Sequence, residues 1–218
     1  MKKLLACLLV LAMVLSVAAC GGPEDVRGTK GDSTPASQDE EFSLGENDGL
    51  KYESKFIGIG CTLPKGWSFY TDEQIKELNN LTQEMAGEEF TEAIENATVV
   101  YDMYATSEDM ASNCIVNLEK TNAVVLLALD VKDVYKNQQE TIKAAYENMG
   151  AEDVNFEIST VTIGDKSFDC MNMSAKLYEV TLNQTMFCIK CNGYLASVAI
   201  TADSAEAVAD VLDCFYLV

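Results

Sequence analysis

Hydrophobic and polar residues alternate with two different periods along the chain from residue 53 onward. Between Phe56 and Leu63 every second residue is apolar, which predicts a strand. Between Asp130 and Met149 apolar residues recur at helical spacing, and Gly150 follows as a natural stop, so this segment predicts a long helix. Alternation and turn residues predict further strands at 97–106, 113–119, 155–163, 167–175, 180–190 and 194–201.

Short polar motifs mark where other elements begin or turn. Thr71-x-x-Gln74 is a capping box that predicts a helix start, with a short helix at 88–95 after it. Asp203-x-x-Glu206 predicts the start of a last helix that reaches Phe215. Asn192-Gly193 is a strong hairpin signal, and its two-residue turn pairs Cys191 with Tyr194. This register puts the following side chains on one apolar face: Phe187, Ile189, Ala196 and Val198.

The order of these elements predicts an α+β fold. We expect one domain over residues 53–218, with a largely antiparallel sheet flanked by helices as an α/β/α sandwich. Residues 20–52 are rich in Gly, Ser, Asp and Glu and hold only scattered apolar side chains, so they predict a flexible acidic linker.

The strand that runs into Leu63-Pro64-x-Gly66-Trp67, the long helix ending at Gly150 and the closing hairpin plus helix resemble the PsbP-like fold. This fold is also seen in DcrB-like bacterial lipoproteins, and the similarity spans most of residues 53–218. The resemblance implies a non-catalytic envelope or accessory protein, as an analogy of fold that carries over no functional residue. We expect Trp67 to lie beneath its turn and to pack on the first helix.

The first twenty residues, MKKLLACLLVLAMVLSVAAC, have the layout of an export signal. Lys2 and Lys3 precede an apolar run that is shorter than the roughly 20 residues of a membrane-spanning helix. Val17-Ala18-Ala19-Cys20 resembles the bacterial lipobox, which implies that residues 1–19 are a signal peptide and that Cys20 is acylated. The membrane partner is then reached through this lipid, on the extracytoplasmic face of the cell membrane. An ordinary secretion cleavage site and an uncleaved anchor are the open alternatives.

Charge limits the classes of partner. The chain carries 35 acidic and 15 basic side chains, a formal net charge of −20. Nucleic acid is an unsuitable partner because binding to a polyanion requires basic residues that displace counterions. Anionic lipid headgroups are repelled as well, so we expect the domain to stand off the membrane on its linker.

The absence of histidine restricts catalysis. Ser-His-Asp and Cys-His nucleophile pairs and His-ligated zinc centres are excluded. Three adjacent carboxylate pairs are candidates for acid and nucleophile roles, namely Asp72/Glu73, Glu88/Glu89 and Glu152/Asp153. Each pair lies at a predicted helix start or in a loop, where carboxylates ordinarily face solvent. We therefore expect no enzyme activity, no catalytic residue, no cofactor and no metal.

Six cysteines fall in the predicted domain: Cys61, Cys114, Cys170, Cys188, Cys191 and Cys214. An exported protein can join them as disulfides, whereas alternation with apolar neighbours is typical of small buried thiols, and the sequence leaves both open. Cys188-x-x-Cys191 has the spacing of thiol oxidoreductases, so a thiol-redox or other extracytoplasmic enzyme is the alternative function. Because this motif precedes a hairpin instead of opening a helix, we expect no Cys188–Cys191 bridge. We expect Cys188 to be the more accessible thiol unless a second helical layer covers its side of the sheet. The preferred function is a lipid-anchored, non-catalytic binding or accessory protein with an unidentified envelope protein or ligand as its partner.

Overall fold

The computed structural model describes residues 42–71, 73–75 and 99–218. Its larger sheet contains β4 (Trp67–Phe69), β5 (Val99–Ser107), β6 (Asn113–Lys120), β7 (Ala151–Ile163), β8 (Lys166–Leu177), β9 (Val180–Cys191) and β10 (Tyr194–Ala202). Its smaller sheet contains β1 (Glu46–Asp48), β2 (Lys51–Ser54), β3 (Ile59–Thr62) and β11 (Phe215–Leu217). The helices with full bounds are α4 (Ala123–Ala128), α5 (Val131–Asn148) and α6 (Ala205–Leu212).

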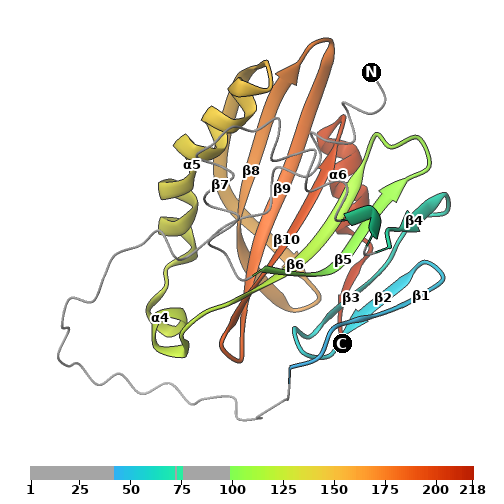
Figure 1. The fold of residues 1–218 in the computed structure, drawn as a ribbon, viewed down its shortest axis with the longest axis vertical. Helices are drawn as coiled ribbons and strands as arrows, with labels where there is room; N and C mark the ends of the chain where they lie inside the picture. Colours follow the sequence, from blue (N-terminus) through green and yellow to red (C-terminus); the bar gives the residue numbers. More distant parts are fainter. Residues whose placement is uncertain (1–41, 72, 76–98) are drawn as a thin grey trace.

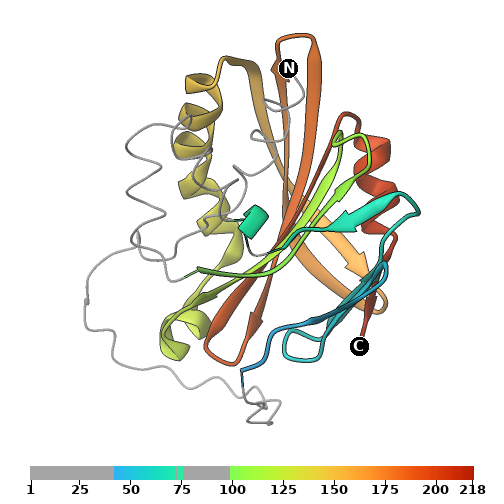
Figure 2. The same ribbon diagram turned by 45° about the vertical axis from the view of Figure 1, so that its right-hand side comes forward.

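The two sheets pack as separate layers. The larger one has the order β4-β5-β6-β10-β9-β8-β7 and the smaller one β1-β2-β3-β11. Every strand pair among the described residues is antiparallel. Helix α5 lies along one face of β7 and β8, while α6 and the smaller sheet lie on the other side (Figures 1 and 2). The expected antiparallel sheet is therefore confirmed.

Each face of the larger sheet has its own core. Under α5, the buried side chains of Tyr135 and Tyr146 pack with Met171 and Met186 from the sheet. On the opposite face, the smaller sheet and α6 bury a second cluster that includes Phe187. The strands alternate between the two clusters because successive side chains of a strand point to opposite faces.

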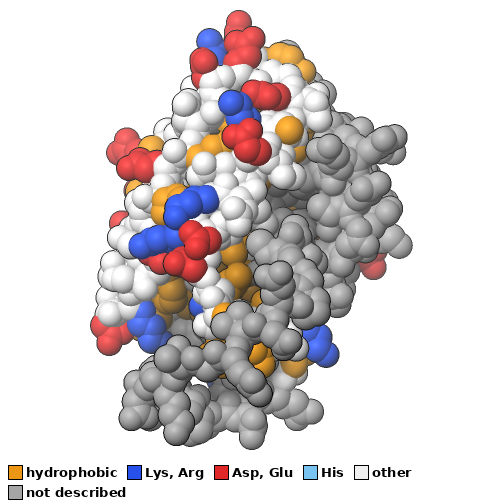
Figure 3. All heavy atoms as spheres, turned by 90° about the vertical axis from the view of Figure 1, so that its left-hand side faces the viewer, with side chains coloured by type: hydrophobic (Ala, Val, Ile, Leu, Met, Phe, Trp, Pro, Cys, Tyr) orange, Lys and Arg blue, Asp and Glu red, His pale blue; other side chains and the backbone are white. Residues whose placement is uncertain are grey.

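The long helix predicted over 130–149 is confirmed as α5. Asp130 is its N-cap, and its carboxylate accepts a hydrogen bond of 2.9 Å from the backbone N–H of Lys132. The helix ends at the C-cap Met149, and Gly150 follows with a positive φ of 88°. Its outer surface carries interspersed positive and negative side chains, with the pairs Lys136–Asp133 and Lys143–Glu147 (Figure 3).

The predicted hairpin is confirmed together with its register. Asn192 and Gly193 both have positive φ values, 35° and 82°, as a type I′ turn requires. Cys191 pairs with Tyr194, and Phe187 pairs with Val198 four residues further along each strand. The apolar side chains predicted to share a face do so, and they all pack in the cluster beneath the smaller sheet.

The α/β/α sandwich is wrong, because much of the second covering layer is a sheet and not helices. Helix α6 begins after Ser204 instead of Asp203, since the Ser204 hydroxyl accepts a hydrogen bond from the Ala207 N–H at 3.2 Å. It stops at Leu212, and Phe215 then pairs with Cys61 of β3. The fold is thus an α+β arrangement dominated by two sheets.

Structure begins earlier than the predicted end of the linker at residue 52. Strands β1 and β2 fall partly within that range, and they are held by the buried Asp102 of β5. The Asp102 carboxylate accepts hydrogen bonds from the Gly45 N–H and the Tyr52 hydroxyl, both at 2.6 Å. Residues 46–52 therefore belong to the fold.

Some predicted features lie outside the described residues: the signal peptide 1–19, Cys20 and the short helix at 88–95. The capping box is present, because the Thr71 N–H donates to Gln74 Oε1 at 2.9 Å and the Gln74 N–H donates to Thr71 Oγ1 at 3.4 Å. Residues 73–75 are helical as predicted, and the remainder of that helix is not described. Across the described part of the chain, no helix combines the length and apolar character needed to cross a bilayer.

Candidate functional site: a polar groove beside α6

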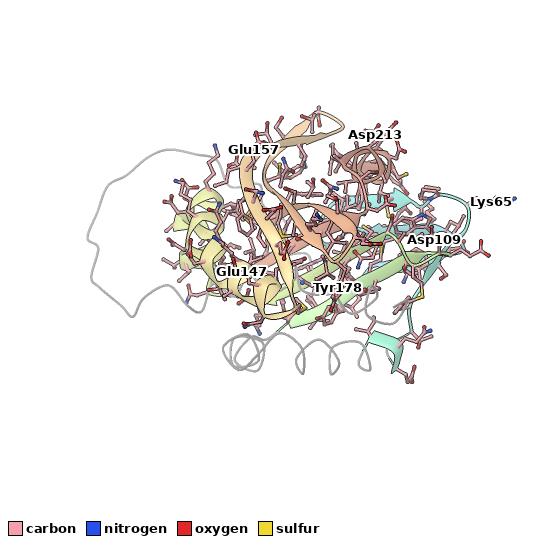
Figure 4. The ribbon with its side chains drawn as sticks, turned by 90° about the horizontal axis from the view of Figure 1, so that it is seen from above. Lys65, Asp109, Glu147, Glu157, Tyr178 and Asp213 are labelled. Atoms are coloured by element: carbon pink, nitrogen blue, oxygen red, sulfur yellow. The ribbon has the colours of Figure 1, made fainter. Side chains whose placement is uncertain are left out.

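A groove of about 640 Å³ lies between α6 and the adjoining face of β7, β8 and β9. Its wall is apolar and comes from α6, through Ala205, Val208, Ala209 and Leu212. Seen from above, Glu157 on β7 and Asp213 just after α6 lie on the same side of the molecule, away from Glu147 on α5 (Figure 4). The groove therefore opens on the side of the sheet that α5 does not cover.

The floor of the groove follows from strand alternation. In β7, Phe156 and Ile158 pack toward α5, which directs the residues between and beside them to the opposite face. The register then aligns Glu157 with Asn172 of β8, and Asn172 with Thr185 of β9. We call the resulting set the polar floor: Asn155, Glu157, Ser159, Asn172, Ser174, Asn183 and Thr185.

Hydrogen bonds tie the centre of the polar floor together. The Thr185 hydroxyl donates to Asn172 Oδ1 at 2.8 Å, and Asn172 Nδ2 donates to Ser159 Oγ at 2.9 Å. Ser159 Oγ also lies 3.0 Å from the sulfur of Cys170. These two hydrogen bonds of Asn172 fix the orientation of its side-chain amide. They leave the second N–H of that amide for another acceptor. The floor is therefore oriented before any ligand arrives.

The electrostatics of the groove favour uncharged groups. Glu157 is the single charged side chain among the residues that line it. Burial raises the pKa of the Cys170 thiol, although its contact with Ser159 acts in the opposite direction. A protonated thiol is a weak nucleophile, and Cys170 is buried beneath the floor, where its sulfur contacts Ser159.

The two thiols of the Cys188-x-x-Cys191 motif lie on opposite faces of β9. Cys188 is only 6% exposed and faces the core under α5, while the half-buried Cys191 packs with the opposite cluster. Cys188 is not the more accessible thiol, because α5 is the helical layer that was named as the exception and it covers this side of the sheet. Burial raises the pKa of both thiols, that of Cys191 to about 12. All six cysteines of the described residues are free.

Three of the six carboxylate candidates, Glu73, Glu152 and Asp153, lie in the described part of the chain, and all three are exposed. Glu152 and Asp153 are exposed at an irregularity of β7, and Glu73 is exposed at the start of the first helix. Asp72 and the Glu88/Glu89 pair lie outside the described residues. Within the described ranges, no group of three or more Cys, Asp or Glu side chains is placed to hold a metal ion.

Trp67 lies in the edge strand β4, where it is half-buried and paired with Ser107 of β5. It borders a second, smaller hollow of about 340 Å³ with Lys65 and Asp109, which Figure 4 shows on the side away from α5. The tryptophan therefore packs against the core from the rim and is not fully enclosed by it.

No protein-family model matches the chain, and no curated protein matches it either. A solved structure from Bacteroides thetaiotaomicron VPI-5482 is similar to 78% of this chain, at 14% identity and a TM-score of 0.41, over 48% of its own length. A structure described as LpqN, involved in cell envelope biogenesis of Mycobacterium tuberculosis, is similar to 73% of this chain, at 14% identity and a TM-score of 0.39, over 82% of its length. Neither likeness is close enough to assign a family.

Proposed function

We propose that this chain is a lipid-anchored bacterial lipoprotein that binds an uncharged polar ligand of the cell envelope in the groove beside α6. The observation that carries the proposal is the hydrogen-bonded row from Thr185 through Asn172 to Ser159 on the groove floor. Anchoring rests on acylation of Cys20 after removal of residues 1–19 and leads to the extracytoplasmic face of the cell membrane. Membership of the PsbP-like and DcrB-like proteins is part of the same proposal.

The chemistry of the groove supports a neutral, hydroxyl- or amide-bearing ligand such as a segment of an envelope glycan. Asn and Ser side chains of the floor supply both donors and acceptors, which hydroxyl groups match in either sense. An apolar ligand would cover polar groups of the floor, such as the second Asn172 N–H, without offering them a hydrogen-bond partner, which is costly. An anionic ligand meets Glu157 and a formal net charge of −20.

A non-catalytic role fits this chemistry better than the alternative thiol-redox enzyme. A redox thiol needs an accessible sulfur with a lowered pKa. Cys188 and Cys191 have raised pKa values and pack in different clusters. Reduction of insulin disulfides by the purified protein would favour the redox alternative over the binding role.

Anchoring is tested by changing Cys20. The wild-type protein is expected to enter the detergent phase and to incorporate radiolabelled palmitate, whereas Cys20→Ala loses both and keeps the folded domain. Unchanged processing and membrane retention of Cys20→Ala would contradict the lipid anchor.

Ligand binding is tested with uncharged oligosaccharides. We expect the N-acetylglucosamine tetramer, as a neutral probe with hydroxyl and amide groups, to give measurable heat on titration into the wild-type protein. Asn172→Ala is expected to abolish that heat, because it removes the central member of the row. Asn47→Ala, an exposed amide on β1, is the matched control and should bind as the wild type does. Equal binding by Asn172→Ala, or no binding by the wild type to a panel of neutral oligosaccharides, would exclude the groove as a glycan site.

A further inference from the structure

Helix α4 presents apolar side chains to the outside of the molecule. Its sequence, AVVLLA, contains no charged or polar residue, and five of its six residues are exposed. Leu127 is 85% exposed and Val124 is 74% exposed, which are the highest values among the large hydrophobic residues of the described chain. Contiguous exposed apolar side chains on the surface of a soluble protein often mark a site that binds a partner or a membrane.

The helix is held in this exposed position from both ends. The Asn122 side chain caps it by accepting a hydrogen bond of 2.8 Å from the Val124 N–H. Leu126 is its single buried residue and packs into the core under α5. Just beyond the helix, the Lys190 ammonium donates a hydrogen bond to the backbone carbonyl of Leu129. The outward direction of Leu127 is therefore a feature of the folded state.

Helix α4 lies at the end of the molecule where the chain enters the fold. Phe42, the first described residue, stacks on Tyr194 with ring centroids 4.8 Å apart. Tyr194 directly follows Gly193, whose carbonyl accepts a hydrogen bond of 2.9 Å from the Thr121 N–H, next to α4. Figure 1 shows α4 and the β9–β10 turn at the same lower end of the molecule. Phe42 itself is 40% exposed, so the entry point adds to the apolar character of this end.

We propose that α4 inserts its apolar side chains into the outer surface of the lipid bilayer, so that this end of the domain rests on the membrane. The inference rests on the proposed function, because the anchor at Cys20 supplies the proximity. The linker that the sequence predicts between Cys20 and Phe42 would average roughly 25 Å end to end as a random coil, which would keep α4 within reach of the bilayer. Because the anchor holds α4 near the bilayer, the contact can form even if it is too weak to bring an unanchored protein to the membrane.

A bilayer suits this surface better than a protein groove does. Val124 and Leu127 project from a short convex helix, a shape that enters fluid lipid without a complementary pocket. The exposed side chains of Lys120 and Lys190 flank the helix, and Asp130, two residues after it, is engaged as the N-cap of α5. The repulsion expected from the net charge of −20 acts on anionic headgroups, whereas insertion of apolar side chains into zwitterionic lipid does not depend on it.

The contact also orients the groove. Thr185 on the groove floor lies six residues of strand away from Cys191 at the β9–β10 turn, which corresponds to about 20 Å. With α4 on the bilayer, the groove floor lies at this distance along the strand from the turn beside the lipid, and the groove stays open to envelope ligands. The exposed Tyr178 belongs to the β8–β9 turn, and Figure 1 shows this turn at the end of the molecule opposite α4.

The test uses full-length lipidated protein, purified from bacterial membranes and reconstituted into phosphatidylcholine vesicles. A Trp67→Phe background removes the native fluorophore, and Leu127→Trp introduces a new one on α4. Vesicles made with brominated phosphatidylcholine are expected to remove most of the fluorescence of Leu127→Trp. Tyr178→Trp in the same background is the matched control, and its fluorescence should be unchanged.

The outcomes separate the two proposals. Failure of the protein to float with the vesicles would reject the lipid anchor itself. Flotation without quenching of Leu127→Trp, or equal quenching of Tyr178→Trp, would overturn the membrane contact of α4 and leave the anchor intact. A blue-shifted Leu127→Trp spectrum in detergent-free buffer without vesicles would instead show α4 covered by protein, and would also overturn the contact.

Discussion

The two faces of β8 show how the length of a covering element determines where a sheet can be polar. Met171, Met173 and Ala175 face α5 and are buried, whereas Asn172 and Ser174, between them, face the groove. With 18 residues α5 extends about 27 Å, while α6 with 8 residues extends only about 12 Å. Because α6 and the smaller sheet do not reach the end of β7 and β8, that part of the face stays open and polar. The groove is thus created by incomplete coverage of one face.

The largest expected effect comes from the covered face. Met186→Ala removes a side chain that is 1% exposed under α5, so it should lower the free energy of unfolding by about 2–5 kcal/mol. Ser174→Ala on the open face is the control and should change it by less than about 0.5 kcal/mol. Urea unfolding followed by circular dichroism measures both. Similar losses for the two variants would mean that the faces do not differ as described.

A smaller loss is expected at the centre of the open face. Asn172→Ala removes one acceptor and one donor of the polar floor and leaves the buried Thr185 hydroxyl without its partner. We expect a decrease in the free energy of unfolding of about 1–3 kcal/mol, the usual cost of an unpaired buried polar group. The same urea titration compares it with Ser174→Ala. A loss as small as that of the control would show that the row has no structural role.

The smallest expected effect is a decrease in the free energy of unfolding at alkaline pH, caused by the buried thiols. Burial raises the pKa of Cys61 and that of Cys191 to about 12, so their protonated forms are favoured in the fold. Stability from these thiols is complete below the unfolded pKa of about 8.5 and is lost as the pH rises toward 12, by up to about 1.4 kcal/mol per pH unit and thiol. Urea unfolding at pH 7.5 and pH 9.5 should show this decline. Cys61→Ala should reduce the difference between the two values, and an unchanged difference would refute the assignment.

Elements built from local patterns were predictable from the sequence. The apolar spacing over 130–149 predicted α5, and Asn192-Gly193 predicted the hairpin and its register. Both elements depend mainly on interactions between residues that are close in sequence. Strand β1 could not be predicted, since Glu46–Asp48 is fully exposed and lacks any apolar alternation. Strand β11 was mistaken for the end of a helix because its pairing with β3 joins distant parts of the chain.

The groove was missed for a related reason. Ser159, Asn172 and Thr185 are ordinary polar positions when each strand is read alone. They form one polar surface because the register aligns the three strands, and this surface stays open because α6 is short. A usable signal was present, namely polar residues at alternate positions in three successive strands. The anchor motif at Cys20 lies outside the described residues and stays a prediction.

The buried Asp102 determines how the fold responds to a mechanical pull on its N-terminal segment. Such a pull first loads Phe42, which stacks on Tyr194, and then Gly45, immediately before β1. A short antiparallel strand loaded at its end would separate from β2 one residue pair at a time. Asp102 instead connects Gly45 and Tyr52 directly to β5. The Asp102 carboxylate therefore transmits force from the N-terminal segment to β5 of the larger sheet. The β1–β2 hairpin carries less of that force.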